Sequence, residues 1–250
     1  MAGTAVHGRL TWQLAKVTAV TAETSSVVTI ELDVPGWASH QAGQHLDVRL
    51  TADDGYQAER EYSIASAPGE AVAITVERVV DGEVSTYLTE DIRAGDELEL
   101  RGPVGGYFVW DSGACDPLTL LAGGSGIVPL RSILRHRRRL GDDTPARLLY
   151  SARTLADVIY RDELEQYRDG AQVSYTLTRA QPAGWTGHSG RINRALLAEV
   201  AWPAKANPVA YVCGPTSFVE TAAAALVDLG YPPDRVKTER FGGTEGISPR

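Results

Sequence analysis

The pattern of apolar residues changes near residues 111–116, and this change restricts the possible fold more than any other feature of the chain. Before it, short runs rich in Val, Ile and Thr are separated by Gly, Pro and Asp, which is typical of strands joined by turns. After it, apolar runs alternate with helical patterns, which favours a parallel sheet with crossover helices. The sequence therefore predicts two domains of different class, residues 1–113 and residues 114–250.

The first domain is predicted to be a small all-β unit. Strands are expected at residues 12–20, 27–34, 45–50, 61–66, 72–79 and 97–101, with one short helix at residues 85–92. Runs this short and this closely spaced favour a closed antiparallel β-barrel of Greek-key type.

The second domain is predicted to be α/β, a Rossmann-like, doubly wound parallel sheet. Its strands are expected at residues 118–122, 146–151, 172–178, 209–212 and 236–239. Helices are expected between them at residues 130–140, 160–168, 192–200 and 216–229. Residues 242–250 form a polar tail.

Composition limits the classes of function. The chain of 250 residues carries a net charge of −8, which disfavours nucleic acid as a partner. No apolar run approaches the ~20 residues that span a bilayer, and residues 1–8 lack a signal-peptide core, so a cytoplasmic location without a membrane span is expected. The two cysteines, Cys115 and Cys213, are too few for an iron–sulfur cluster, and no metal site is expected.

The stretch Arg60-Glu61-Tyr62-Ser63-Ile64-Ala65-Ser66 carries the most specific chemistry. Alternate side chains share one face of a strand, so Arg60 and Tyr62 are expected to point the same way. A guanidinium suits a pyrophosphate and a phenol ring suits stacking on a flat heterocycle, which together indicate a flavin nucleotide. The alternative is an ordinary strand with a half-buried Tyr and a solvated Arg.

Two glycine turns follow predicted strands and precede predicted helices. They are Gly123-Gly124-Ser125-Gly126-Ile127-Val128-Pro129 and Cys213-Gly214-Pro215-Thr216. Glycine lets the backbone approach an anion closely, and the free N–H groups of a helix N-terminus bind phosphate. The alternative for both is a tight strand–helix turn without a ligand.

In this order, and with Thr238-Glu239-Arg240-Phe241 near the end, these stretches resemble the ferredoxin–NADP reductase family of flavoproteins. The resemblance extends over residues 10–242. It implies an FAD-dependent NAD(P)H oxidoreductase, with FAD on the barrel and NAD(P) on the parallel sheet.

The resemblance implies contacts for each residue of the motifs. Arg60 would pair with the FAD pyrophosphate, Tyr62 would stack on the isoalloxazine ring, and Ser63 would donate near flavin N5 if the strand ends or bends there. Ser66 completes the FAD form of the motif. Gly82, Val84, Ser85 and Thr86 open the short helix, and they would bind the second side of the pyrophosphate or form a plain helix cap.

On the coenzyme side, Gly124, Ser125 and Gly126 would hold the diphosphate, and Cys213, Gly214 and Pro215 would lie beside the nicotinamide. Thr178, Arg179 and Arg191 match the positions that carry the 2′-phosphate in NADP-linked relatives, which favours NADPH, because a 2′-phosphate needs cations. Arg153 also ends a predicted strand, but it occurs in NADPH-linked and NADH-linked relatives alike. NADH stays possible, since Trp185-Thr186-Gly187 is similar to NADH-linked relatives. Ser63, Cys213 and Glu239 are the expected catalytic residues, although Cys213 is not expected to act as a nucleophile. Glu239 and Phe241 would approach the flavin, or Glu239 would be a solvated charge.

The resulting prediction is a reductase that takes a hydride from NAD(P)H to bound FAD. It then passes single electrons to an external ferredoxin, haem, molybdenum or oxygenase protein. Two alternatives stay open: a reductase that uses flavin as a diffusible substrate, and a flavin-binding subunit or redox sensor without turnover. Arg131, Arg135 and Arg139 recur every fourth residue, which predicts a solvated helix face or a docking patch for an acidic partner.

Overall fold

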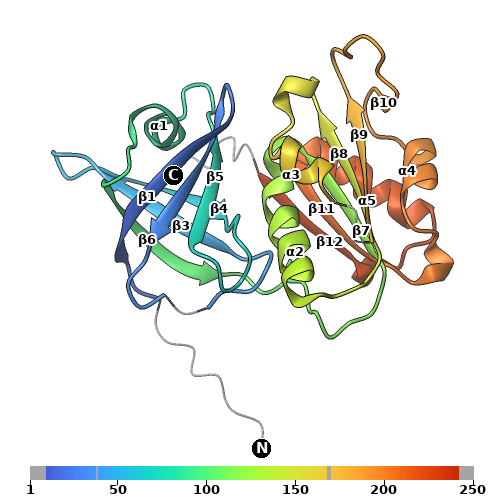
Figure 1. Cartoon of the computed structure of the whole chain (residues 1–250), viewed down its shortest axis with the longest axis horizontal. Helices are drawn as coiled ribbons and strands as arrows, with labels where there is room; N and C mark the ends of the chain where they lie inside the picture. Colours follow the sequence, from blue (N-terminus) through green and yellow to red (C-terminus); the bar gives the residue numbers. More distant parts are fainter. Residues whose placement is uncertain (1–9, 38, 168–169, 242–250) are drawn as a thin grey trace, which may run out of the picture.

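The computed structural model describes residues 10–37, 39–167 and 170–241, which form two domains side by side (Figure 1). The first is a β-barrel and the second is a parallel sheet covered by helices on both faces. The predicted fold class is confirmed for both halves. No helix in the described ranges is long and apolar enough to cross a membrane.

The barrel is a six-stranded antiparallel sheet in the order β4-β3-β6-β1-β2-β5. The strands are β1 (Gln13–Thr24), β2 (Val27–Asp33), β3 (His45–Thr51), β4 (Gln57–Ser63), β5 (Val72–Glu77) and β6 (Glu97–Val104). An antiparallel bridge between Ile64 and Ile74 joins the end of β4 to β5 and closes the sheet. Alternation places Ile30 and Leu32 of β2 in the barrel core while Glu31 and Asp33 are exposed.

Several elements of the barrel differ from their predicted bounds, since β1 and β6 extend beyond residues 20 and 101 and β5 ends before residue 79. The strand predicted at residues 61–66 begins earlier and ends at Ser63, because the next residues leave β3 and pair with β5 instead. The helix predicted at residues 85–92 is α1 (Glu83–Thr86), which continues as a π-helical turn, Tyr87–Asp91.

The second domain is a parallel sheet in the order β10-β9-β8-β7-β11-β12. The strands are β7 (Leu118–Gly123), β8 (Ala146–Ala152), β9 (Ala171–Leu177), β10 (His188–Ser189), β11 (Val209–Pro215) and β12 (Val236–Phe241). The helices are α2 (Ile127–Leu140), α3 (Arg161–Glu165), α4 (Arg194–Val200) and α5 (Thr216–Asp228). Only part of the helix predicted at residues 160–168 forms, as α3, and residue 168 lies outside the described residues.

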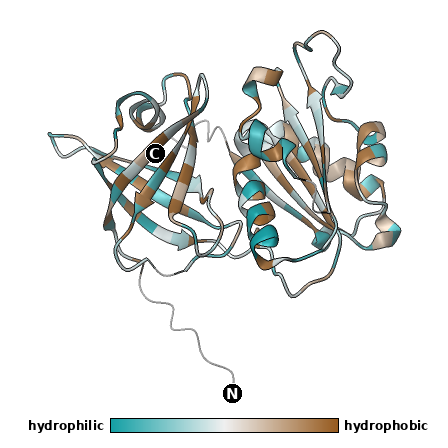
Figure 2. Ribbon diagram, viewed as in Figure 1, coloured by the Kyte–Doolittle hydropathy of each residue, from teal (hydrophilic) through white to brown (hydrophobic). Residues whose placement is uncertain are grey.

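Hydrophobic residues follow the central strands of both sheets, and α2 carries hydrophobic and hydrophilic residues on different sides (Figure 2). Leu130, Ile133 and Leu134 of α2 are buried in a core shared with β7 and β8. The same core includes Ala73 of β5 and Ala65, so the barrel and the parallel sheet are packed together through α2.

Arg131 and Arg135 of α2 lie in this contact, so the predicted solvated helix face is wrong for these two residues, whereas Arg139 is exposed. Arg131 donates to Glu163 at 2.8 Å and to the carbonyl oxygen of Ala65 at 3.2 Å. Arg135 donates from Nε and Nη2 to the two carboxylate oxygens of Glu70 at 3.1 and 2.9 Å, and Arg139 lies 3.5 Å from the same carboxylate. Arg131 and Arg135 are therefore held by ion pairs within the protein, and the docking patch stays a prediction.

Candidate functional site

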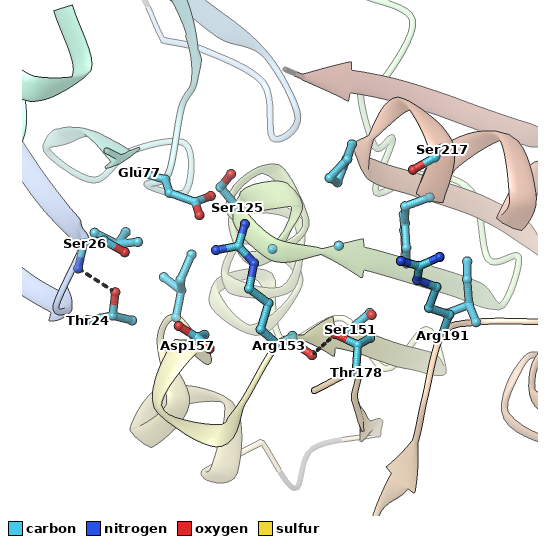
Figure 3. A pocket seen from close by; sticks show the side chains of 18 of the residues that line it. Thr24, Ser26, Glu77, Ser125, Ser151, Arg153, Asp157, Thr178, Arg191 and Ser217 are labelled. Carbon is cyan, nitrogen blue, oxygen red and sulfur yellow. Dashed lines mark hydrogen bonds between the residues drawn. The ribbon is translucent and has the colours of Figure 1, made fainter. Parts of the chain in front are cut away.

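A cavity of 390 Å³ lies at the carboxyl ends of the parallel strands, where ligands bind in open α/β sheets (Figure 3). Its wall comes from both domains. The second domain contributes Gly123, Gly124, Ser125, Ser151, Ala152, Arg153, Asp157, Ile159, Thr178, Arg191, Ile192, Pro215, Ser217, Phe218 and Thr221, and the barrel contributes Thr24, Ser26, Val27 and Glu77.

The turn after β7 has the form of an anion cradle. Gly124–Gly126 make one 3₁₀ turn that leads directly into α2, and no side chain caps either N-terminus. Gly124 adopts a φ of +54°, which glycine tolerates without strain. Gly124 and Ser125 line the cavity whereas Gly126 does not, and no side chain competes with a ligand for the N–H groups at this helix N-terminus.

The arginines predicted to bind coenzyme separate into two groups. Arg153 and Arg191 line the cavity, as does Thr178, whereas Arg179 is exposed and does not line it. Arg179 remains near the site, since its N–H donates to the carbonyl oxygen of Arg153 at 2.9 Å. Within the described residues none of the three guanidiniums forms an ion pair.

Several residues of the cavity were not predicted. Phe218 lies over two glycines: a Cβ at Gly123 or Gly214 would stand 2.9 Å from its ring. Its place in the first turn of the helix after Cys213-Gly214-Pro215 was the available signal. No sequence signal marked the cavity residues of the barrel, Glu77, Thr24 and Ser26, because they reach the cavity only through the packing of the two domains.

The three predicted catalytic residues come together at the seam, the contact of the end of β4 with β11 and β12. Cys213 and Glu239 are aligned neighbours on β11 and β12, and Ser63, the last residue of β4, lies close enough to the Glu239 carboxyl to lower its pKa. The strand therefore ends where the Ser63 side chain can turn to the seam, as the flavin contact requires.

The electrostatics of the seam disfavour negative charge. Burial and the repulsion of Glu61 raise the pKa of Glu239 to about 7, against the opposing effect of Ser63. Its Oε2 is buried and has no hydrogen-bond partner among the residues that the structure describes. Burial, with the nearby Glu239, also raises the pKa of the Cys213 thiol, so a thiolate nucleophile is disfavoured there.

The β4 residues lie as an FAD contact would require. Arg60 is exposed, and its guanidinium donates only to the adjacent carbonyl oxygen of Glu59. Tyr62 is half-buried on the barrel core, and burial raises its pKa to about 12, against the effect of Arg60. In the part of the chain that the structure describes, Arg60 forms no ion pair and Glu239 Oε2 has no hydrogen-bond partner. With the neutral phenol ring of Tyr62, these groups are chemically suited to a flavin nucleotide laid along β4.

Some of the other residues predicted to contact FAD already form hydrogen bonds or packing contacts within the protein. The Ser66 hydroxyl accepts from the N–H of Ala73 at 3.1 Å. The Ser85 hydroxyl accepts from the N–H of Val79 and donates to the carbonyl oxygen of Gly82, each at 3.1 Å. Val84 is buried in the barrel core, so only its backbone can meet a ligand. Thr86 and Phe241 are half-buried, and Phe241 ends β12 beside Pro215.

Two family models match the two domains. The model of the oxidoreductase FAD-binding domain matches residues 13–109, and that of the oxidoreductase NAD-binding domain matches residues 120–224. The chain belongs to the ferredoxin–NADP reductase-like family of FAD-dependent oxidoreductases. The predicted resemblance is confirmed, and the part of the cavity wall that the second domain supplies lies within the NAD-binding match.

Members of the ferredoxin–NADP reductase-like family with assigned roles are similar over most of the chain. The reductase component of propane 2-monooxygenase from Mycolicibacterium goodii is 30% identical over 237 residues, which cover 90% of this chain and 66% of the relative. NADH oxidoreductase HCR from Escherichia coli K12 is 33% identical over 223 residues, covering 88% and 65%. The chain thus spans less than two thirds of the length of each.

A solved structure shows the same arrangement of domains. The ferredoxin reductase in carbazole 1,9a-dioxygenase superposes with a TM-score of 0.82 at 25% identity, over 94% of this chain and 71% of that one.

Proposed function

We propose that this chain is a flavoprotein reductase that takes a hydride from NAD(P)H to bound FAD and passes electrons singly to an external acceptor protein. The observation that carries the proposal is the seam. There the end of β4, with Tyr62 and Ser63, lies beside Cys213 and Glu239, at the same edge of the parallel sheet as the coenzyme cavity.

FAD, when bound, would supply the hydride acceptor and the one-electron chemistry. The chain's own residues hold and orient it. Arg60 would bind the pyrophosphate, Tyr62 would stack on the ring, and the backbone of Gly82–Thr86 would support the second side of the pyrophosphate. Ser63 and Glu239 hold a proton at the seam, since a carboxyl with a pKa of about 7 exists in both forms near neutral pH.

The coenzyme diphosphate rests on Gly124, Ser125 and Gly126, and the nicotinamide lies near Gly214 and Pro215. We assign a preference for NADPH, because Arg153 and Arg191 line the cavity without ion-pair partners in the described chain and suit a 2′-phosphate. NADH is the alternative, which the name of the Escherichia coli relative favours.

The names of the relatives support an oxygenase component or a ferredoxin as the acceptor. The domain boundary stays a proposal at residues 113 and 114, in the interval between the two family-model matches. Cytoplasmic location likewise stays a prediction, in keeping with the unpaired, exposed Cys115.

A reductase of diffusible flavin is the second candidate, and one observation favours it. Ser66 and Ser85, which the family resemblance assigns to FAD, use their hydroxyls within the barrel. Fewer side-chain contacts would retain the flavin less tightly.

The visible spectrum of the purified protein tests both candidates. A yellow protein after gel filtration that bleaches on anaerobic addition of NADPH or NADH supports retained FAD. A colourless protein that reduces added riboflavin supports the second candidate. A protein that reduces neither bound nor added flavin with either coenzyme contradicts both.

A further inference from the structure

Glu77 places a carboxylate in the wall of the coenzyme cavity, and nothing derived above uses it. It is the last residue of β5 and pairs with Val27 of β2, so the barrel supplies it. Figure 3 shows its side chain directed to the space occupied by Ser125 and Arg153 of the other domain.

The carboxylate stands over the turn that forms the anion cradle. A Cβ added at Gly124 would lie 3.9 Å from Glu77 Oε2, and no other atom comes within 4 Å of that position. The carboxylate therefore lies at the same part of the cavity wall as the turn proposed to hold the diphosphate.

Glu77 has no internal partner that neutralises it. Within residues 10–37, 39–167 and 170–241 it forms no ion pair and no side-chain hydrogen bond. Its charge is felt by the protein, since it contributes to raising the pKa of the buried Tyr150 after the larger effect of burial. Asp157, the other acid of the cavity, differs because Thr154 donates to it from both N–H and hydroxyl.

A carboxylate is the wrong charge for holding a diphosphate. Phosphate sites are built from cations and N–H donors, which this cavity has in Arg153 and the Gly124–Gly126 turn. A like charge at this range opposes the ligand, and its effect is greater in a cavity than in open water.

We infer that Glu77 limits the affinity of this reductase for pyridine nucleotides by repelling their diphosphate from across the domain contact. The inference rests on the proposed function and adds to it a residue that determines coenzyme affinity. Glu77 weakens binding of NAD⁺ and NADP⁺ alike, because both carry the diphosphate, and it thereby favours release of the oxidised coenzyme.

Calorimetric titration of the flavoprotein and its Glu77→Gln variant tests this inference. At low ionic strength the variant should bind NAD⁺, NADP⁺ and ADP-ribose about three- to tenfold more tightly than the wild type. Affinity for 2′-AMP, which lacks the diphosphate, should not change. At about 0.5 M salt, where the Debye length is about 4 Å, the difference should shrink to less than about twofold.

Glu31→Gln is the matched control, because it removes the same charge from an exposed position of β2 outside the cavity. It should leave every affinity unchanged. Equal or weaker binding by Glu77→Gln would overturn the inference, and weaker binding would mean that Glu77 accepts a hydrogen bond from the coenzyme. Tighter binding that salt does not reduce would overturn it too. Failure of the wild type to bind any dinucleotide would instead refute the proposed function.

Discussion

Gly126 lies directly against the backbone of Cys213. A Cβ at position 126 would stand 2.0 Å from the carbonyl oxygen of Cys213 and 2.8 Å from the nitrogen of Gly214. The turn after β7 and the end of β11 therefore touch main chain to main chain. This contact joins the Gly124–Gly126 turn to the Cys213-Gly214-Pro215 turn, the two parts of the proposed coenzyme site.

Gly126→Ala should therefore destabilise the protein and weaken coenzyme binding together. Backbone cannot move aside as a flexible side chain can, so we expect a loss of about 1–3 kcal/mol in the free energy of unfolding, measured with urea. Gly106→Ala is the control, because a Cβ there meets nothing within 4 Å. Equal stability of the two variants would contradict the close contact.

Local sequence signals predicted the existence of helices and strands more accurately than the residues at which they end. Glycine turns and apolar runs marked both domains and their strand–helix alternation. The end of β4 was missed because Ile64 pairs with Ile74 of β5, a choice set by barrel closure. No local pattern records such a pairing, whereas the motif inside the strand, Arg60 to Ser63, does not depend on it.

The same limit explains why the surroundings of some charged side chains were predicted wrongly or missed. Arg131 and Arg135 have helical spacing, so they resemble a solvated face, but their partners Glu70 and Glu163 are distant in sequence. Glu77 was missed for the opposite reason, since it ends an ordinary strand and reaches the cavity only through domain packing. Motif residues could be predicted from one segment, and wall residues supplied by the other domain could not.

Arg191→Ala should raise KM for NADPH about tenfold or more and KM for NADH much less, because only NADPH carries the 2′-phosphate. Steady-state kinetics with both coenzymes measures the effect. Arg179→Ala is the informative comparison, since Arg179 follows β9, the strand next to β10 that precedes Arg191, but lies outside the cavity wall. We expect a smaller change for it. Equal losses with both coenzymes in Arg191→Ala would contradict the NADPH preference.

Glu70→Gln should destabilise the contact of the two domains at neutral pH. Burial opposes ionisation of Glu70, but hydrogen bonds from Arg135 and the N–H of Ala67 outweigh it and lower the pKa. Because the pKa of Glu70 is lower in the folded protein than in the unfolded chain, its ionised form adds to the free energy of unfolding at a pH above the unfolded pKa. This contribution is lost as the pH falls through the folded pKa. We expect a loss of about 1–3 kcal/mol at pH ~7 by urea unfolding, shrinking below pH ~4. A loss that is unchanged in acid would show that the charge of Glu70 is not the cause.

Glu239→Gln should affect stability mainly at high pH, whereas Glu70→Gln should affect it mainly at neutral pH and not in acid. The pKa of Glu239 is raised to about 7 by burial and by Glu61, so the folded protein holds its proton more tightly than the unfolded chain does. The contribution of protonated Glu239 to the free energy of unfolding is fully present at a pH below its unfolded pKa. It is lost as the pH rises through the folded pKa of about 7. The Gln variant cannot ionise, so its free energy of unfolding should exceed that of the wild type at pH ~8 by up to about 3 kcal/mol and match it near pH ~4.

Urea unfolding across this pH range measures the difference. Glu61→Gln is an independent check, because removing the repulsion from Glu61 should lower the pKa of Glu239. Parallel pH profiles for wild type and Glu239→Gln would show that the carboxyl at the seam is already solvated.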